Sequence, residues 1–174
     1  LYGLCRVADL DEPESGLIDD LVSRREEVSV GQRIVTAGQP FTEIIAVKSG
    51  AFKTSVALAN GVEQAVDFFL PGELMGLEAL SEGHYQNSIE ALEPSSVCRF
   101  NLSRVYLLEQ RMADFQQQLI RALSRHTRRD QWVPLLMGAK SAEQRIALFL
   151  IGLSTRFIEH GLPLSLIHIS EPTR

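Results

Sequence analysis

A hydrophobic strand that runs into a Pro-Gly turn constrains this chain more than any other feature. The run Asp67-Phe-Phe-Leu-Pro-Gly-Glu-Leu-Met-Gly76 begins with strand-forming side chains, and the strand must stop at Pro71, which has no N–H for a ladder hydrogen bond. Gly72 and Gly76 permit positive φ angles or a close backbone approach. Backbone cradles of this kind often hold a phosphate. We therefore predict a ligand-pocket-like turn at Gly72, Glu73 and Gly76, in a sensor domain and not an enzyme.

Length and charge bound the architecture. The 174 residues, 45% of them hydrophobic, suffice for one core and a helical extension. The net charge of −5 speaks against a chain that coats nucleic acid or membrane by bulk charge, so any DNA contact must be local. No apolar run approaches the roughly 18 residues of a spanning helix, and no secretory leader is visible. We expect a cytoplasmic protein.

Residues 28–103 alternate apolar and polar side chains in short runs separated by turn signals, which predicts an all-β domain. Asn60-Gly61 is the clearest hairpin turn. Ile44 to Val47 is expected to be a buried strand. The predicted strand regions are 33–36, 43–50, 51–58, 62–70, 88–92 and 95–102.

The period becomes helical after Leu102, and residues 104–137 are predicted to form a dimerisation helix. Pro134 should kink or end it near Val133. An alternative is that its apolar stripe packs on the chain's own β domain. The stripe steps by 4, 3, 4, 3 and 4 residues, as in paired helices, through Leu119, Leu123, His126, Asp130, Val133 and Met137.

The remaining segments complete the domain plan. Ser141-Ala-Glu-Gln144 has capping-box form, so a second helix is predicted within 141–161, ending near Glu159. Residues 1–27 are expected to form an N-terminal segment with a short helix, in a fragment truncated at its start. Residues 164–174 resemble the translation of a sequencing adapter and are expected to be a non-native tail, with a genuine short tail as the alternative.

The turn at 71–76 resembles the P-G-E-x-x-G hallmark of the cyclic-nucleotide-binding β-roll in the cAMP receptor protein and its relatives, the CRP/FNR superfamily. The resemblance implies an α+β fold, with an antiparallel, jelly-roll-like β-roll (a double-stranded β-helix) flanked by helices and followed by the dimerisation helix. Nucleotide-binding relatives carry an Arg-Ser or Arg-Thr pair after the turn. Here the matching Gly83-His-Tyr-Gln-Asn-Ser88 has none, and no Lys or Arg occurs from Thr54 to Cys98. We expect no cAMP or cGMP binding, and a lone loop His84 is more simply solvated.

The two cysteines, Cys5 and Cys98, lie far apart in a chain without secretory features, which favours reduced thiols or metal ligation over a disulfide. Their neighbourhoods, Leu4-Cys5 and Ser96-Val-Cys98, resemble cluster-ligand positions of the fumarate and nitrate reduction regulators, the FNR type. This implies a [4Fe-4S] cluster in the intact parent protein, with two further cysteines upstream. Two thiols alone should not assemble it. Either cysteine is otherwise a small buried hydrophobe.

The resemblance implies the sensory and dimerisation part of an oxygen-responsive, homodimeric transcription regulator for anaerobic conditions. Promoter DNA and RNA polymerase would be contacted through a missing helix-turn-helix that follows residue 161. If the stripe from Leu119 to Met137 forms the seam between two paired helices, Asp130 is the candidate residue for adjusting the strength of the dimer. The alternative is that Asp130 faces solvent. The alternative function is a CRP-like domain that senses another small ligand or thiol oxidation. An enzyme is not expected, because the histidines are scattered and no nucleophile motif is present.

Overall fold

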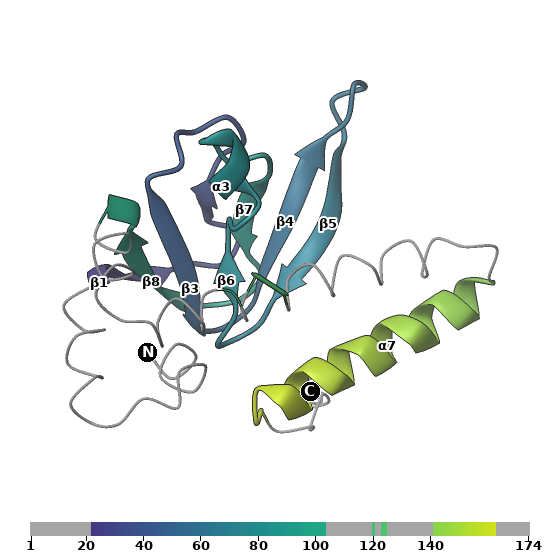
Figure 1. Ribbon diagram of the computed structural model, residues 1–174. Helices are drawn as coiled ribbons and strands as arrows, with labels where there is room; N and C mark the ends of the chain where they lie inside the picture. Colours follow the sequence, from purple (N-terminus) through teal and green to yellow (C-terminus); the bar gives the residue numbers. More distant parts are fainter. Residues whose placement is uncertain (1–21, 104–119, 121–122, 125–140, 163–174) are drawn as a thin grey trace, which may run out of the picture. The chain divides into compact units, whose positions relative to one another are not determined.

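The computed structural model describes residues 22–103, 120, 123–124 and 141–162. The chain divides into two compact units, Leu1–His126 and Thr127–Arg174, and each is described by itself. In the first unit, eight described strands form two four-stranded antiparallel sheets that face each other (Figure 1). The predicted β-roll is therefore confirmed.

The chain passes from one sheet to the other between most consecutive strands, which winds it into a roll. The first sheet has the order β1-β8-β3-β6, with β1 at Val22–Val28, β8 at Ser95–Asn101, β3 at Glu43–Ser49 and β6 at Leu74–Met75. The second has the order β2-β7-β4-β5, with β2 at Arg33–Val35, β7 at Ser88–Ala91, β4 at Phe52–Ala57 and β5 at Glu63–Phe69.

The hydrophobic core lies between the sheets. The predicted buried strand is confirmed, because Ile44, Ile45, Ala46 and Val47 are all at most 5% exposed. Successive side chains point to opposite faces of a strand, so four buried neighbours mean that β3 is covered on both faces. Other fully buried side chains of the roll are Phe52, Phe69, Met75, Ile89 and Val97.

The predicted hairpin is also confirmed, and Figure 1 shows that it extends beyond the rest of the roll. Gly61 has a φ of 81°. The Asn60 side chain accepts the Val62 N–H at 3.0 Å, which stabilises the turn locally. Strand β5 ends at Phe69, before Pro71, as the missing proline N–H requires.

Three described elements, β1, β6 and α3 (Ala79–Glu82), were not predicted from the sequence. Strand β1 begins at Val22, so residues 22–27 belong to the roll and not to the N-terminal segment. Its sequence Val-Ser-Arg-Arg-Glu-Glu-Val lacks apolar alternation, because β1 is an edge strand that pairs with β8 alone. Strand β6 and helix α3 are too short to produce a periodic signal.

Helix α7 (Ala142–Glu159) confirms the second predicted helix. Ser141 and Gln144 form the predicted capping box, in which each side chain accepts the other residue's N–H, at 3.4 and 3.1 Å. The helix ends at Glu159. Gly161, just beyond it, has a φ of 59°, and the Leu162 N–H donates to the Phe157 carbonyl of the last turn at 2.8 Å. Neither described α-helix is long and apolar enough to cross a membrane.

Most of the predicted dimerisation helix, 104–137, lies outside the described residues. Ile120, Leu123 and Ser124 are helical where they are described. Residues 1–21 and 164–174 also lie outside, so the corresponding domain limits stay predictions.

Candidate functional site

Hydrogen bonds to Leu70 and to strand β3 hold the predicted ligand turn, which contains Gly72, Glu73 and Gly76. Gly72 and Gly76 have φ angles of 94° and 80°. Glu73 is 8% exposed, and its Oε2 accepts the Leu70 N–H at 2.9 Å. The Gly72 N–H donates to a carbonyl of β3 at 2.9 Å. The Glu73 carboxylate therefore stabilises the turn from within.

The ring of Tyr85 packs against this turn. A Cβ built on Gly76 would lie 2.5 Å from Cε1 of Tyr85, so only glycine fits there. The ring meets Phe41 edge-on, with centroids 5.3 Å apart, and its hydroxyl donates to the Glu43 carbonyl at 2.6 Å. Burial raises the pKa of Tyr85 to about 12, although the positive charge of Arg99 acts to lower it. The phenol is thus a neutral, structural hydrogen-bond donor.

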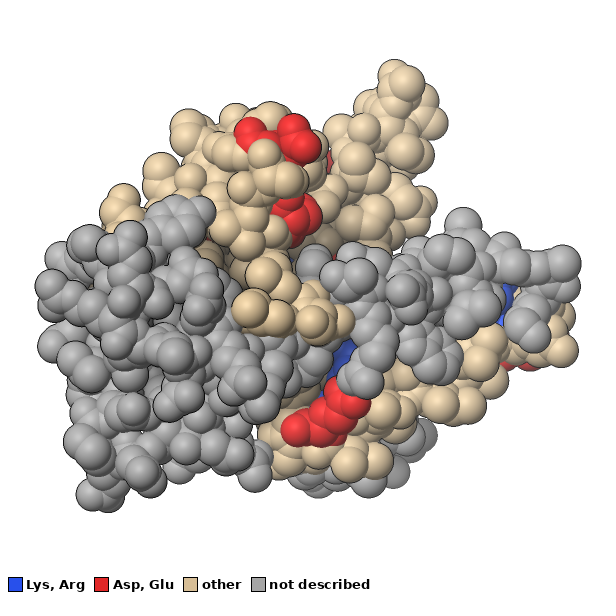
Figure 2. Space-filling view, viewed as in Figure 1, with Lys and Arg blue, Asp and Glu red and all other residues tan. Residues whose placement is uncertain are grey.

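The surroundings of the turn are acidic. Figure 2 shows acidic atoms and no basic ones over α3. The Oε1 atom of Glu78 is buried without a hydrogen-bond partner among the described residues. His84 is exposed, and its Nδ1 lies 2.9 Å from the Glu82 carbonyl. Because residues 54–98 contain no Lys or Arg, a phosphate at this turn would lack a countercharge from them.

Cys98 is a free thiol buried on the outer face of its sheet. It lies in β8, directly opposite Arg25 on β1 and Ala46 on β3, and it is 0% exposed. The next residue, Arg99, donates to the Ile34 carbonyl of the other sheet at 3.2 Å, so Arg99 points into the roll. Neighbouring side chains of a strand point to opposite faces, so the Cys98 thiol points out of the roll.

This position fits a thiolate ligand whose partner ligands come from outside the roll. Two neighbours on the outer face, Ala46 and Ser96, have small side chains. A thiol on the inner face would be sealed between the sheets. In the part of the chain that the structure describes, no group of three or more His, Cys, Asp or Glu side chains could hold a metal ion. Cys5 lies outside that part, so the predicted ligand roles of Cys5 and Cys98 stay predictions.

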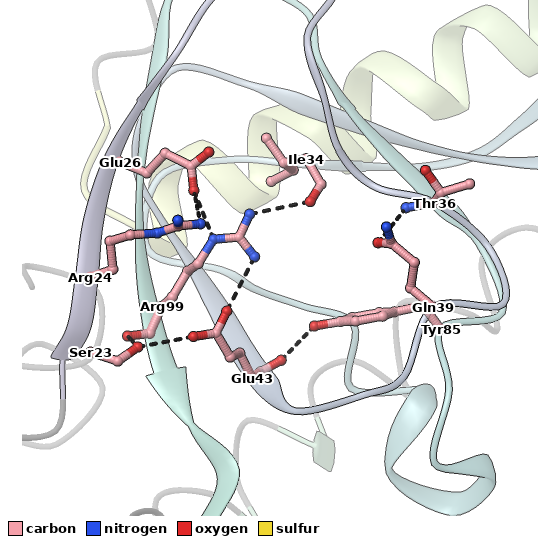
Figure 3. Close-up of polar contacts among 9 residues, drawn as sticks. All are labelled: Ser23, Arg24, Glu26, Ile34, Thr36, Gln39, Glu43, Tyr85 and Arg99. Carbon is pink, nitrogen blue, oxygen red and sulfur yellow. Dashed lines mark hydrogen bonds and ion pairs between the residues drawn. The ribbon is translucent and has the colours of Figure 1, made fainter.

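An ionic cluster around the buried Arg99 joins four strands and was not predicted from the sequence (Figure 3). The Arg99 Nε donates to Glu26 Oε2 of β1 at 2.8 Å, and Nη1 lies 3.5 Å from Glu43 Oε2 of β3. The Ser23 hydroxyl lies 2.9 Å from the Arg99 carbonyl and 3.1 Å from Glu43 Oε1. The available signal was an arginine inside the otherwise uncharged strand region 95–102, which requires buried partners.

A cavity of about 340 Å³ opens beside this cluster. One side of it is formed by the loop before β3, where the Gln39 side chain accepts the Thr36 N–H at 3.0 Å. Its lining mixes apolar and hydrogen-bonding groups: Ile34, Val35, Gln39, Pro40, Thr42, Glu43, Tyr85 and Arg99.

Comparison with known proteins places the chain in a family. The family described as "Cyclic nucleotide-binding domain" matches residues 25–111. "Transcriptional activator protein FnrA" of Stutzerimonas stutzeri is 37% identical over 161 residues, covering 92% of this chain and 66% of that protein. The chain belongs to the CRP/FNR family. A second CRP/FNR relative, "Fumarate and nitrate reduction regulatory protein" of Escherichia coli K12, is 34% identical over 158 residues and shares 91% of this chain and 63% of its own length.

The chain therefore spans about two thirds of the length of these curated CRP/FNR relatives. FixK2 from Bradyrhizobium japonicum superimposes with a TM-score of 0.69 at 23% identity, over 83% of this chain and 80% of that one, which shows the fold. The two curated relatives are named as a transcriptional activator and a regulatory protein of this regulator family, which confirms the expectation of a non-enzyme.

One predicted seam residue of this CRP/FNR chain is described. Leu123 is half-buried and packs against the hydrophobic core of the roll. This contact is the one expected if the stripe covers the chain's own roll. Pairing stays a prediction, because the other seam residues, Leu119, His126, Asp130, Val133 and Met137, lie outside the described residues.

Proposed function

We propose that this chain is the sensory and dimerisation part of a cytoplasmic transcription regulator that responds to oxygen through a [4Fe-4S] cluster. The observation that carries the proposal is the outward-facing thiol of Cys98, on a strand held by β1 on one side and β3 on the other. The names of the two curated relatives, an activator protein and a fumarate and nitrate reduction regulatory protein, support this function.

Cys98 and Cys5 would each supply one thiolate to the cluster. The chain contains two cysteines, and a [4Fe-4S] cluster takes four thiolates, so the other two must come from residues outside these 174. When bound, the cluster supplies an oxygen-labile redox centre. The roll contributes a thiol whose position is fixed by ladder partners on both sides, which favours a single ligand geometry.

We propose further that the parent protein is a homodimer that contacts promoter DNA and RNA polymerase through residues that follow α7. The seam from Leu119 to Met137 would form the pairing surface. In that case Asp130 would face its counterpart across the two-fold axis, and repulsion between the two carboxylates would make the dimer adjustable.

A cyclic nucleotide is not the signal in this proposal. The Glu73 carboxylate already accepts the Leu70 N–H, and residues 54–98 offer no Lys or Arg to a phosphate. Titration calorimetry with cAMP and cGMP should show no heat of binding. A micromolar dissociation constant would contradict this part of the proposal.

One observation favours a second candidate, a CRP-like regulator that senses another small molecule. The cavity beside Tyr85 and Arg99, about 340 Å³, is large enough for such a ligand. Sensing by thiol oxidation is disfavoured at Cys98, because the side chain is 0% exposed and oxidants react with accessible thiolates.

The deciding experiment begins by sequencing the source locus through both ends of this chain. The full-length product is then purified without oxygen, and its iron content and visible absorption are measured. We expect about four iron atoms per protomer, lost in Cys98→Ser and kept in Ser96→Ala, a matched change on the same strand face. A wild-type product without iron would contradict the cluster and favour the small-molecule candidate.

A further inference from the structure

We propose that Arg99 is a positioning residue for the Cys98 site. Its guanidinium holds the edge strand β1 in register with β8 and so fixes the point at which the N-terminal segment joins the sheet. That point is Val22, which pairs with Phe100, two residues from Cys98. The link to the cluster rests on the proposed function, whereas the effect on β1 does not.

Strand β1 has little apolar anchorage of its own. It pairs with β8 alone, and its ladder is irregular between Val22 and Arg24. From residue 23 onward Val28 is its one buried side chain, so the hydrophobic pattern specifies the register weakly. The remaining side chains of this stretch are exposed or half-buried: Ser23, Arg24, Arg25, Glu26 and Glu27.

Arg99 supplies the missing anchorage from inside the roll. Its side chain is 8% exposed and is held on three sides by Glu26 of β1, Glu43 of β3 and the Ile34 carbonyl of β2 (Figure 3). A planar guanidinium with three such partners has one position, and it therefore dictates where the Glu26 carboxylate must lie. Without that carboxylate, β1 would lose its ionic link to the interior of the roll.

The inner cluster and the outer thiol are coupled through register. Glu26 lies opposite Val97 and points inward, and Arg25 lies opposite Cys98 on the outer face. A slip of β1 by one residue would turn Glu26 outward and change the residue beside the thiol, because side chains alternate strictly along a strand. The ion pair at Arg99 thus controls the geometry of a site on the other face of the sheet.

Hydrogen–deuterium exchange on the 174-residue chain tests the first part of the proposal, that Arg99 holds β1 in place. In Glu26→Gln and Arg99→Gln, the amides of β1 should exchange at least about tenfold faster than in the wild type, while those of β4 keep their protection. The matched control is Arg33→Gln, which breaks a 2.8 Å pair with Glu63 in the other sheet and should leave β1 unchanged. Arg99→Lys should not restore protection, because one ammonium does not reproduce the fork of contacts.

Should Arg99→Gln fail to fold, Glu26→Gln carries the test, because it leaves Arg99 paired with Glu43. Protection of β1 within about twofold of the wild type in Glu26→Gln would overturn the proposal, since a register lock must show in the exchange of its own strand.

Cluster retention in the full-length, anaerobically purified product tests the second part of the proposal, that Arg99 positions the Cys98 site. The visible iron–sulfur absorption of Glu26→Gln should decay at least about tenfold faster in air than that of Arg33→Gln, because supporting residues of a metal site typically change its stability by 10–100-fold. Equal decay rates, with β1 loosened, would overturn the positioning role. A wild type without iron would instead refute the proposed function, and the exchange result would still decide the effect on β1.

Discussion

The ring of Tyr85 occupies the space in which a side chain at Gly76 would have to lie. A Cβ there would be 2.5 Å from the ring, and the φ of 80° at Gly76 is itself unfavourable for other residues. Two segments, the turn after β6 and the loop after α3, are therefore fitted to each other by one glycine and one aromatic ring. The ligand-turn glycine has a packing role that its place in the hallmark motif does not reveal.

Gly76→Ala should be strongly destabilising. We expect a loss of about 2–5 kcal/mol in the free energy of unfolding by urea, from positive-φ strain plus overpacking against Tyr85. Gly61→Ala is the matched control, because its φ is 81° but nothing lies within 4 Å of an added Cβ. Equal losses of unfolding free energy in the two variants would mean that overpacking against Tyr85 does not contribute to the destabilisation.

Tyr85 should make the protein sensitive to alkali. Burial raises the Tyr85 pKa from 10.0 to about 12, so the unfolded chain releases this proton first and stability falls as the pH rises between these values. The free energy of unfolding should fall by about 2–3 kcal/mol over this pH range. Tyr85→Phe should be about 1 kcal/mol less stable at neutral pH, because it lacks the hydrogen bond to the Glu43 carbonyl. Its stability should depend less on pH in the alkaline range. Parallel profiles for the two proteins, measured by urea unfolding, would contradict this assignment.

Glu90 should contribute to stability above its ordinary pKa. The hydrogen bond from Lys53, 2.9 Å away, lowers the pKa of Glu90, with Arg33 acting in the same direction. A lowered pKa means that this stabilisation is present at neutral pH and is lost as the pH falls through the acidic range. Glu90→Gln should cost less than about 1 kcal/mol at low salt and nearly nothing at high salt. The exposed Glu93→Gln is the control, and a larger effect there would refute the assignment.

Asp130→Ala tests the proposed seam. If two Asp130 carboxylates face each other, their removal should tighten the dimer by about 1 kcal/mol, or roughly fivefold in dissociation constant, measured by sedimentation equilibrium. Leu123→Ala distinguishes helix pairing from packing on the chain's own roll. If Leu123 only packs on the roll, the variant should lower the free energy of unfolding and leave the dimer dissociation constant unchanged. An unchanged dimer in Asp130→Ala, with and without oxygen, would remove the tuning role.

Local chemistry made much of this fold predictable. The hairpin at Asn60-Gly61, the end of β5 before Pro71 and the capping box at Ser141 each depend on residues a few positions apart. Strand β1 was not predictable in the same way, because its own side chains are mostly polar and its partner strand is distant in the sequence. The bond between Glu26 and Arg99 joins residues 73 positions apart.

The sequence by itself determined most strands and turns of the roll, the limits of α7 and the absence of Lys and Arg from residues 54–98. Periodicity, turn chemistry and composition are properties of the chain that need no tertiary contact. Only the tertiary structure decided that Cys98 faces outward, that Arg99 faces inward and that Tyr85 closes over Gly76. The two facings depend on the register between strands far apart in sequence, where a shift of one residue would reverse the faces. The contact of Tyr85 with Gly76 depends on how the loop after α3 packs on the turn after β6.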